Sequence, residues 1–277
     1  MPMKGCSGEA WPGESVSSDS MRGAKLGQHF LNAQWVARDL VKSVGVRDGE
    51  SVVEIGPGKG ALTKELLAQD TTVIAIEKDT ELIPILNETF SDEVASGQLR
   101  IVQGDIRDVT PEMLGIETYS VAANIPYYIT GEIIRHFLTA AHQPRAMALL
   151  IQKEVAERIV ARDKKESILS LSVQAYGKPS IVAKVPASCF NPPPRVDSAI
   201  LLVDDISRGF FDTISEDNFF KVVKAGFASK RKMLSGNLKG IFEDSAGVLK
   251  ECGIQEKARA EDVELGEWKR IVEKLKD

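Results

Sequence analysis

The sequence predicts an α/β protein in which an open, mostly parallel sheet is covered by helices and is followed by a small all-helical domain. Three observations support this prediction. Short β-branched runs alternate with amphipathic stretches as far as residue 162, which is the rhythm of βαβ units. A glycine-rich turn, Gly56 to Gly60, follows the first of these runs. After residue 215 the pattern is helical, with breaks at glycines.

The expected elements follow in order along the chain. Apolar residues recur at helical spacing in some stretches and form short β-branched runs in others. The expected helices are 35–44, 62–68, 81–89, 131–140 and 153–162. The expected strands are 51–55, 72–76, 99–103, 119–123, 147–152, 181–186 and 198–203, with a late strand antiparallel to the others.

Composition sets the number of domains. A chain of 277 residues that is 43% hydrophobic has enough apolar material for one large core and a smaller appended unit. We expect a disordered tail over 1–24, which is rich in Gly and Ser, a sheet domain over 25–206 and a helical domain over 207–277. Met21 is an alternative natural start.

Composition also indicates the compartment. No apolar run reaches the roughly 20 residues of a transmembrane helix, and residues 1–20 lack the apolar segment of an export signal. Cys6, Cys189 and Cys252 lie far apart and show neither disulfide nor metal-ligand spacing. We therefore expect a cytoplasmic monomer with reduced thiols, no metal and no membrane partner.

Charge bears on nucleic-acid binding. The formal net charge of −5 argues against a protein that binds a polyanion over its whole surface. Residues 219–242 nevertheless hold basic residues and no acidic one, so they form a candidate RNA-binding segment. The alternative is an ordinary solvated helix surface. The candidate RNA-binding residues are Lys221, Lys224, Lys230, Arg231 and Lys232.

The glycine-rich turn, with Gly56, Gly58 and Gly60, is a candidate cofactor site. Glycines permit a tight turn and the close approach of a ligand. Glu77 ends the next expected strand, where a carboxylate can accept hydrogen bonds from ribose hydroxyls. The spacing G-x-G-x-G differs from the G-x-G-x-x-G of dinucleotide sites, which favours S-adenosylmethionine over NAD. A plain tight turn and a surface glutamate remain the alternatives.

Asp105 follows the third expected strand, at the carboxyl edge where open α/β sheets bind ligands. It can accept a hydrogen bond from the cofactor's adenine amine, or it can instead cap a turn before Thr110. Lys78 and Ile106 adjoin Glu77 and Asp105 and complete this group of candidate cofactor residues.

Asn124, Ile125, Pro126 and Tyr127 follow the fourth expected strand and form the candidate catalytic centre. An adenine amine is a poor nucleophile because its lone pair is delocalised into the ring, and two positioned acceptors would favour its pyramidal transition state. The Asn124 side-chain oxygen and the Ile125 carbonyl are these acceptors, and Pro126 fixes the carbonyl's direction. Tyr127 offers a face to an extruded base. The alternative is a proline turn with a core tyrosine.

Phe190 is the candidate for the opposite wall of the base pocket. It lies next to the stiff run Pro192-Pro193-Pro194, so its ring could clamp the second face of the base. A place in the core is the alternative. The expected reaction moves a methyl group from S-adenosylmethionine to an adenine amine in RNA and leaves S-adenosylhomocysteine.

These segments together resemble the small-subunit ribosomal RNA adenine dimethyltransferases, the kasugamycin-resistance methyltransferase family. The resemblance spans about 25–242 and rests on residues 26–31, 54–60, 124–127, 152–155 and 190–198. It implies a Rossmann-like class I methyltransferase fold. It further implies that His29 and Leu31, with Gln28 beside them, line the methionine end of the cofactor. Asn124 would serve both cofactor and target.

The resemblance also implies the substrate. This is a pair of adjacent adenosines in a loop near the 3′ end of small-subunit ribosomal RNA, each methylated twice. We expect this RNA to lie within a partly assembled particle, with naked RNA as the alternative. The macrolide-resistance methylases share the Asn-Ile-Pro-Tyr motif but act on large-subunit RNA, and the segment 192–199 favours the small-subunit enzymes. A non-catalytic assembly factor and an NAD-dependent oxidoreductase are the remaining alternatives.

Overall fold

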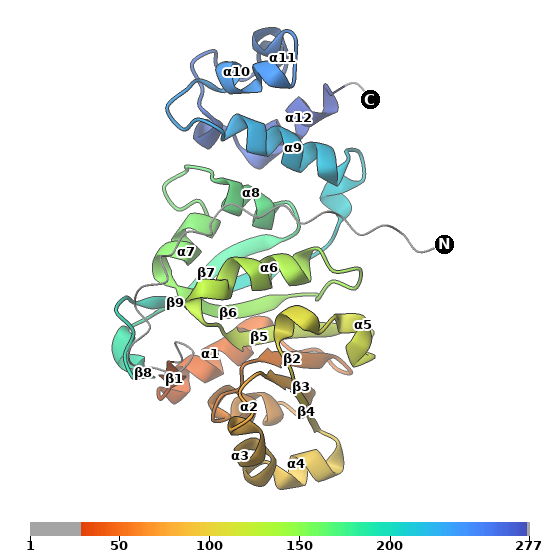
Figure 1. Cartoon of the computed structure of the whole chain (residues 1–277), viewed down its shortest axis with the longest axis vertical. Helices are drawn as coiled ribbons and strands as arrows, with labels where there is room; N and C mark the ends of the chain where they lie inside the picture. The colour runs from red at the N-terminus through yellow and green to blue at the C-terminus, as the bar shows by residue number, and fades with distance from the viewer. Residues whose placement is uncertain (1–28, 276–277) are drawn as a thin grey trace.

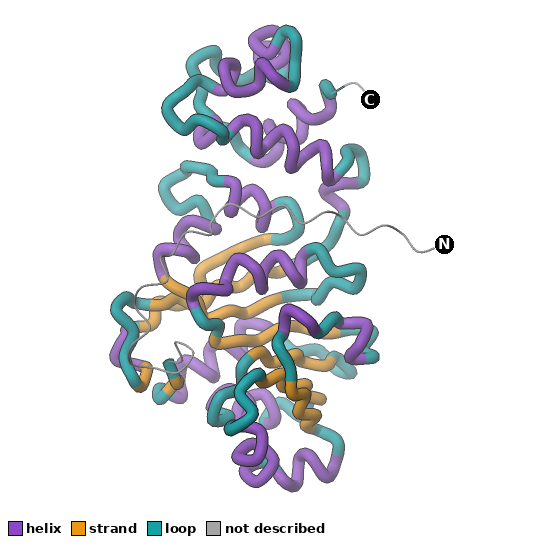
Figure 2. The backbone as a smooth tube through the Cα atoms, viewed as in Figure 1, coloured by secondary structure: helices purple, strands orange, loops and turns teal. Residues whose placement is uncertain are grey.

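The structure is a computed structural model that describes residues 29–275 (Figure 1). The expected tail over 1–24 and Gln28 lie outside these residues. The described chain forms a central sheet with helices on both faces, and a group of helices packs beyond one of these faces (Figures 1 and 2).

The central sheet has seven strands in the order β4-β3-β2-β5-β6-β9-β7. The pairs among β2 to β6 are parallel, whereas β9 is antiparallel to both of its neighbours, β6 and β7. This arrangement confirms the predicted mostly parallel sheet with a late antiparallel strand. The strands are β2 (Ser51–Ile55), β3 (Thr72–Glu77), β4 (Leu99–Gln103), β5 (Tyr119–Asn124), β6 (Met147–Gln152), β7 (Lys178–Val185) and β9 (Ser198–Asp204).

Helices cover each face because successive strand residues point to opposite sides. Val52 belongs to an apolar cluster with α1, α2 and α3, whereas Val53 belongs to a second cluster with α6, α7 and α8. Both faces of the central strands are therefore buried, as is usual for parallel sheets. The helices are α1 (Gln34–Val44), α2 (Ala61–Leu67), α3 (Leu82–Thr89), α6 (Thr130–Leu138), α7 (Lys153–Ile159) and α8 (Ile168–Gln174).

The C-terminal part is helical, as predicted. Phe219 and Trp268 are fully buried there, and both belong to the same apolar cluster as Val53 of the sheet. The division into domains at residue 206 stays a prediction, since this cluster runs across it. The principal helices are α9 (Glu216–Gly226), α10 (Leu234–Asn237), α11 (Ser245–Glu251) and α12 (Leu265–Glu273).

Several short elements were not predicted. The strands β1 (Phe30–Leu31) and β8 (Phe190–Asn191) pair with each other antiparallel and form a separate small sheet. The helices α4 (Ser91–Ser96), α5 (Pro111–Leu114) and α8 were also missed. None of the described helices is long and apolar enough to cross a membrane.

Candidate active site

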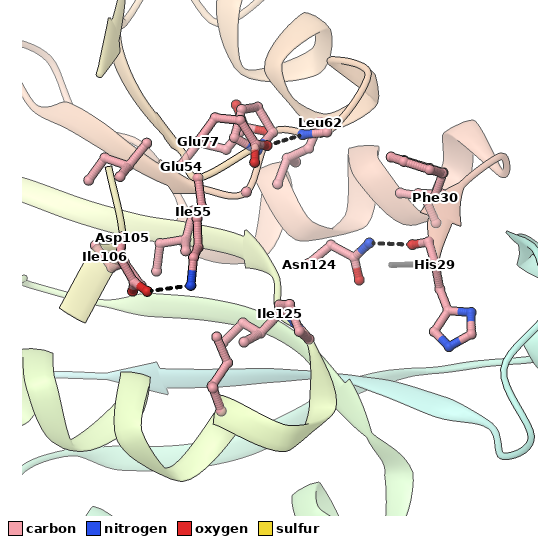
Figure 3. A pocket seen from close by; sticks show the side chains of 18 of the residues that line it. His29, Phe30, Glu54, Ile55, Leu62, Glu77, Asp105, Ile106, Asn124 and Ile125 are labelled. Carbon is pink, nitrogen blue, oxygen red and sulfur yellow. Dashed lines mark hydrogen bonds and ion pairs between the residues drawn. The ribbon is translucent and has the colours of Figure 1, made fainter. Parts of the chain in front are cut away.

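A pocket opens at the carboxyl edge of the sheet, between the glycine-rich turn after β2 and the turn after β5 (Figure 3). Segments that are distant in sequence meet there, because β2, β3, β4 and β5 are parallel and end at the same edge. The predicted site residues that line the pocket are His29, Leu31, Gly56, Gly58, Glu77, Lys78, Asp105, Ile106, Asn124, Ile125, Pro126 and Tyr127.

The glycine-rich turn depends on backbone conformations that favour glycine. Gly56, Gly58 and Gly60 have φ angles of 62°, 59° and 84°. A Cβ atom on Gly60 would lie 2.4 Å from the ring of Phe90. Gly60 does not line the pocket, so its described role is to let the turn pack against α3. Gly56 and Gly58 form the part of the turn that a cofactor can approach.

Glu77, at the end of β3, is held in place by backbone amides. Its Oε2 accepts a hydrogen bond from the Gly58 amide at 3.1 Å, and its Oε1 accepts one from the Asp79 amide at 2.8 Å. Each carboxylate oxygen can accept a second bond. Two acceptor positions therefore remain, and the expected bonds to ribose hydroxyls stay a prediction.

Glu54, in β2, is a pocket residue that the sequence analysis did not single out. It is 1% exposed, and none of the described residues makes a hydrogen bond to its Oε2. Burial, together with the nearby charge of Glu77, raises the pKa of Glu54 to about 8. Its carboxyl group is therefore mostly protonated at neutral pH. A charged residue inside an otherwise apolar strand was the signal for it.

Asp105 is already engaged by cations. It accepts hydrogen bonds from the Arg107 amide and Nε on Oδ1, and from Arg107 Nη2 and Lys78 Nζ on Oδ2. These bonds hold the pKa of the Asp105 carboxyl well below its usual range. Asp105 also caps the short 3₁₀ turn Ile106–Asp108, which was the alternative role. A bond to an adenine amine therefore requires one of these donors to move.

The Asn124 side chain has a defined orientation. Its Nδ2 donates to the main-chain carbonyl of His29 at 3.0 Å (Figure 3). A carbonyl can only accept, so the amide oxygen is the end left for a ligand. Next to it, the Ile125 carbonyl has no hydrogen-bond donor among the described residues, whereas the Pro126 carbonyl accepts from the Ile129 amide. Neither predicted acceptor thus has a donor among residues 29–275, and their role in holding an amine stays a prediction.

Tyr127 is half-buried and anchored. Its hydroxyl shares a hydrogen bond of 2.7 Å with Ser198 Oγ, which ties the turn after β5 to the start of β9. Burial raises the pKa of the Tyr127 hydroxyl, so it remains protonated. One neighbour of its ring is the imidazole of His29, stacked with ring centroids 6.0 Å apart. His29 is itself held by a 2.8 Å hydrogen bond between Nδ1 and the Pro192 carbonyl.

The structure does not bring Phe190 into the pocket. Its side chain is 3% exposed and packs in the apolar cluster beneath α1, while the next residue, Asn191, is exposed. Consecutive residues of a strand point to opposite faces, so pairing β8 with β1 directs Phe190 inward. The described structure therefore gives this residue its alternative role, that of a core phenylalanine.

None of the predicted RNA-binding residues lines the pocket. Lys221 is exposed on α9, and Lys230, Arg231 and Lys232 are exposed in the loop between α9 and α10 (Figure 1). Lys224 is partly buried and interacts with another group. No cluster of His, Cys, Asp and Glu suited to a metal ion occurs among residues 29–275.

A family model for ribosomal RNA adenine dimethylases matches residues 21–277. The chain belongs to the ribosomal RNA adenine dimethylase family. The match also covers the residues after 242, beyond the span of about 25–242 on which the sequence resemblance rests. This membership makes the chain a methyltransferase whose methyl donor is S-adenosylmethionine.

Curated relatives of this dimethylase share most of its length. A protein named ribosomal RNA small subunit methyltransferase A, from Dehalococcoides mccartyi strain 195, is 39% identical over 93% of this chain and 90% of its own. A protein of the same name from Moorella thermoacetica is 38% identical over 88% of this chain and 89% of its own.

Solved structures agree with the fold of this dimethylase. A dimethyladenosine transferase from Plasmodium falciparum has a TM-score of 0.74 at 25% identity, covering 88% of this chain and 96% of its own. The 23S rRNA methyltransferase ErmE has a TM-score of 0.74 at 23% identity, covering 89% of this chain and 99% of its own, which shows the shared fold.

The pocket fits the methyl donor of the family. Glu77 has free acceptor positions at the end of β3, and Gly56 and Gly58 expose backbone without side chains next to it. Glu54, buried and lacking a partner for Oε2, faces the same space. We infer that these residues hold the nucleoside and amino-acid parts of the donor.

Proposed function

We propose that the chain transfers methyl groups from S-adenosylmethionine to N6 of two adjacent adenosines in a loop near the 3′ end of small-subunit ribosomal RNA. Each adenosine receives two methyl groups, as a step in small-subunit biogenesis. The curated relatives named small subunit methyltransferase A support this choice of RNA. The observation that carries the chemistry is the Asn124 amide, whose oxygen is left facing the pocket by the bond of Nδ2 to His29.

The reaction needs residues that hold the amine. The cofactor supplies an electrophilic methyl group attached to sulfur. The Asn124 Oδ1 and the Ile125 carbonyl accept hydrogen bonds from the two N–H groups of the target amine, which draws its lone pair out of conjugation. Pro126 has φ −57° and ψ 129°, and it restricts Ile125 to the extended conformation that points this carbonyl toward the amine.

The second methyl transfer, whose substrate is the monomethylated amine, uses the same acceptors. After the first transfer the amine keeps one N–H, which one acceptor can hold while the methyl group occupies the other side. Tyr127 holds the base by stacking, because its hydroxyl bond to Ser198 keeps the ring in place. Stacking is indifferent to the methyl count, so the same site accepts both substrates.

The partner and setting follow from this substrate. We propose that the chain acts as a monomer in the cytoplasm, on small-subunit RNA within a partly assembled particle. The exposed basic residues of the helical region support binding to the RNA backbone. Loops in such RNA suit an enzyme that extrudes a base, because unstacked bases cost least to remove.

The test is methyl transfer from labelled cofactor onto small subunits that lack these marks. We expect label on two adjacent adenosines, located by mapping the modified nucleotides. Large subunits and fully methylated small subunits are the controls. Label found only in large-subunit RNA would assign the chain to the macrolide-resistance type of activity, and tight binding without any transfer would indicate an assembly factor.

A further inference from the structure

Tyr128 stands at the mouth of the pocket with its ring largely in solvent. It is 60% exposed and lines the pocket. Among residues 29–275, the other large exposed apolar side chains do not line it. No ring contact or hydrogen bond within the described chain holds the Tyr128 side chain. An aromatic ring left exposed beside a binding pocket is available to a ligand.

The side chains of Tyr128 and Tyr127 point in different directions. Both belong to the 3₁₀ turn Tyr127–Ile129, in which successive side chains diverge by about 120°. Tyr127 points inward and is fixed to Ser198, whereas Tyr128 points out to the pocket mouth. A base that enters against Tyr127 therefore leaves its neighbour in the RNA chain near Tyr128.

Cations line the same pocket as this ring. They are Lys59, Lys78 and Arg107, of which Lys59 lies over the ring of Phe30, 5.1 Å from its centroid. The side chains of Lys78 and Arg107 are 56% and 47% exposed, although both contact Asp105 and Arg107 also pairs with Glu132. Aromatic rings combined with cations are the usual elements of a site for single-stranded nucleic acid, in which the bases stack and the phosphates meet positive charge.

We propose that Tyr128 is a stacking platform for the nucleobase that adjoins the target adenosine in the RNA chain. This inference rests on the proposed function. When one adenosine of the adjacent pair is held against Tyr127, the other stacks on Tyr128. Stacking accepts every base but is stronger for larger ring systems, so Tyr128 also favours a purine at this neighbouring position.

The experiment compares full-length wild type with Tyr128→Ala and Tyr128→Phe on small subunits that lack the methyl marks. In Tyr128→Ala, loss of a base stack should raise the KM for the subunits by about 5- to 150-fold. The Kd of the subunits, measured in the presence of S-adenosylhomocysteine, should rise by the same factor. Tyr128→Phe keeps the ring and should stay near wild type. Met113→Ala removes a side chain that is 67% exposed outside the pocket and is the matched control.

A second readout separates stacking from a structural effect. Subunits carrying guanosine or cytidine beside the target should differ in KM for the wild type, and this difference should shrink in Tyr128→Ala. Calorimetry with S-adenosylhomocysteine alone should give the same Kd for wild type and for Tyr128→Ala.

Two outcomes overturn the inference while the proposed function stands. In the first, wild type methylates small subunits and Tyr128→Ala shows unchanged KM and Kd. In the second, Tyr128→Ala weakens S-adenosylhomocysteine by the same factor as the subunits, which would place the ring in the cofactor site. If wild type transfers no label to small subunits, the proposed function itself is wrong.

Discussion

Asn124 receives its orientation from the main chain of another segment. The His29 carbonyl accepts from Nδ2, so rotation of the amide would bring two acceptors together and cost a hydrogen bond. This arrangement prepares Oδ1 as an acceptor before any RNA arrives. A preformed acceptor needs no reorganisation during the reaction, which is the condition under which electrostatic stabilisation is most effective.

Replacing Asn124 by alanine should therefore reduce kcat by about 100-fold or more, the effect of removing one positioned hydrogen-bonding group. Folding should be preserved, because Asn124 is only partly buried and its loss leaves only the His29 carbonyl without a donor. Single-turnover methyl transfer on unmethylated small subunits measures the effect, with circular dichroism as the folding control. Turnover equal to wild type would remove Asn124 from the chemistry.

Glu54 makes stability depend on pH. Its pKa is about 8 in the folded chain and near the ordinary value of 4.5 when unfolded. Between these values the folded chain binds more protons than the unfolded chain, so the free energy of unfolding falls as pH rises, by at most about 1.4 kcal/mol per pH unit. Below pH 4.5 both states are protonated, and this stabilisation is fully present.

Glu54→Gln keeps the shape of the side chain but cannot ionise. Its free energy of unfolding should fall less between pH 5.5 and 8 than that of wild type, as measured by urea unfolding. Glu243→Gln, which changes an exposed carboxylate, is the control and should follow the wild type. If the Glu54→Gln and wild-type curves run parallel, Glu54 is ionised in the folded chain.

At the scale of elements, the turn between β2 and α2 needs both a left-handed backbone conformation and close packing against Phe90. Gly60→Ala would place a Cβ atom 2.4 Å from Phe90 at a φ of 84°, so the turn or α3 must shift. We expect a loss of about 1–3 kcal/mol of stability and weaker binding of S-adenosylhomocysteine, since Gly58 in the same turn donates to Glu77.

Thermal unfolding and calorimetry measure both effects. Gly131→Ala is the matched control, because Gly131 lies in α6, has no left-handed φ and would have no atom within 4 Å of its Cβ. That change should leave stability equal or higher by about 0.5–1 kcal/mol. Equal losses in the two variants would show that the Phe90 contact is unimportant.

The sequence predicted the sheet well because its parallel strands are buried on both faces. Continuous apolar runs such as Met147–Gln152 have the same bounds in the structure as in the prediction. By contrast, β1 and β8 have two residues each and exist only because Leu31 and Phe190 meet across the fold. The helix expected over 153–162 ends at Ile159, and Ala161 then adopts a φ of 47°.

The site was predictable in its location rather than in its contacts. Residues after parallel strands share one edge, which placed Glu77, Asp105 and Asn124 together. The protonation of Glu54 and the cations around Asp105 depend on burial and on side chains brought in by folding. The inward turn of Phe190 likewise follows from a pairing with β1 that no local pattern reveals.

At the scale of the whole molecule, the helical region and the sheet share one apolar core. Phe219 and Trp268 belong to the same cluster as Val53 and Tyr176. We therefore expect one cooperative unfolding transition, with equal calorimetric and van't Hoff enthalpies. Two separated transitions in a calorimetric scan would instead support independent domains on either side of residue 206.

Charge is unevenly distributed over the whole molecule. The chain has a net charge of −5, but the loop between α9 and α10 is basic and exposed. If Lys230, Arg231 and Lys232 contact RNA phosphates, changing all three to alanine should weaken subunit binding. The slope of log K against log salt concentration should also become shallower by up to about 3, roughly one per lost contact. Titrations at several salt concentrations measure this slope.

The control variant changes Lys42, Arg47 and Lys64 to alanine, which removes the same number of positive charges from exposed positions on the opposite side of the sheet. A general electrostatic effect would lower binding equally in both triple variants, because net charge alone attracts or repels the polyanion at long range. A local phosphate site changes the slope only in the variant of the α9–α10 loop. Affinity for S-adenosylhomocysteine should be unchanged in both, since neither set of residues lines the pocket.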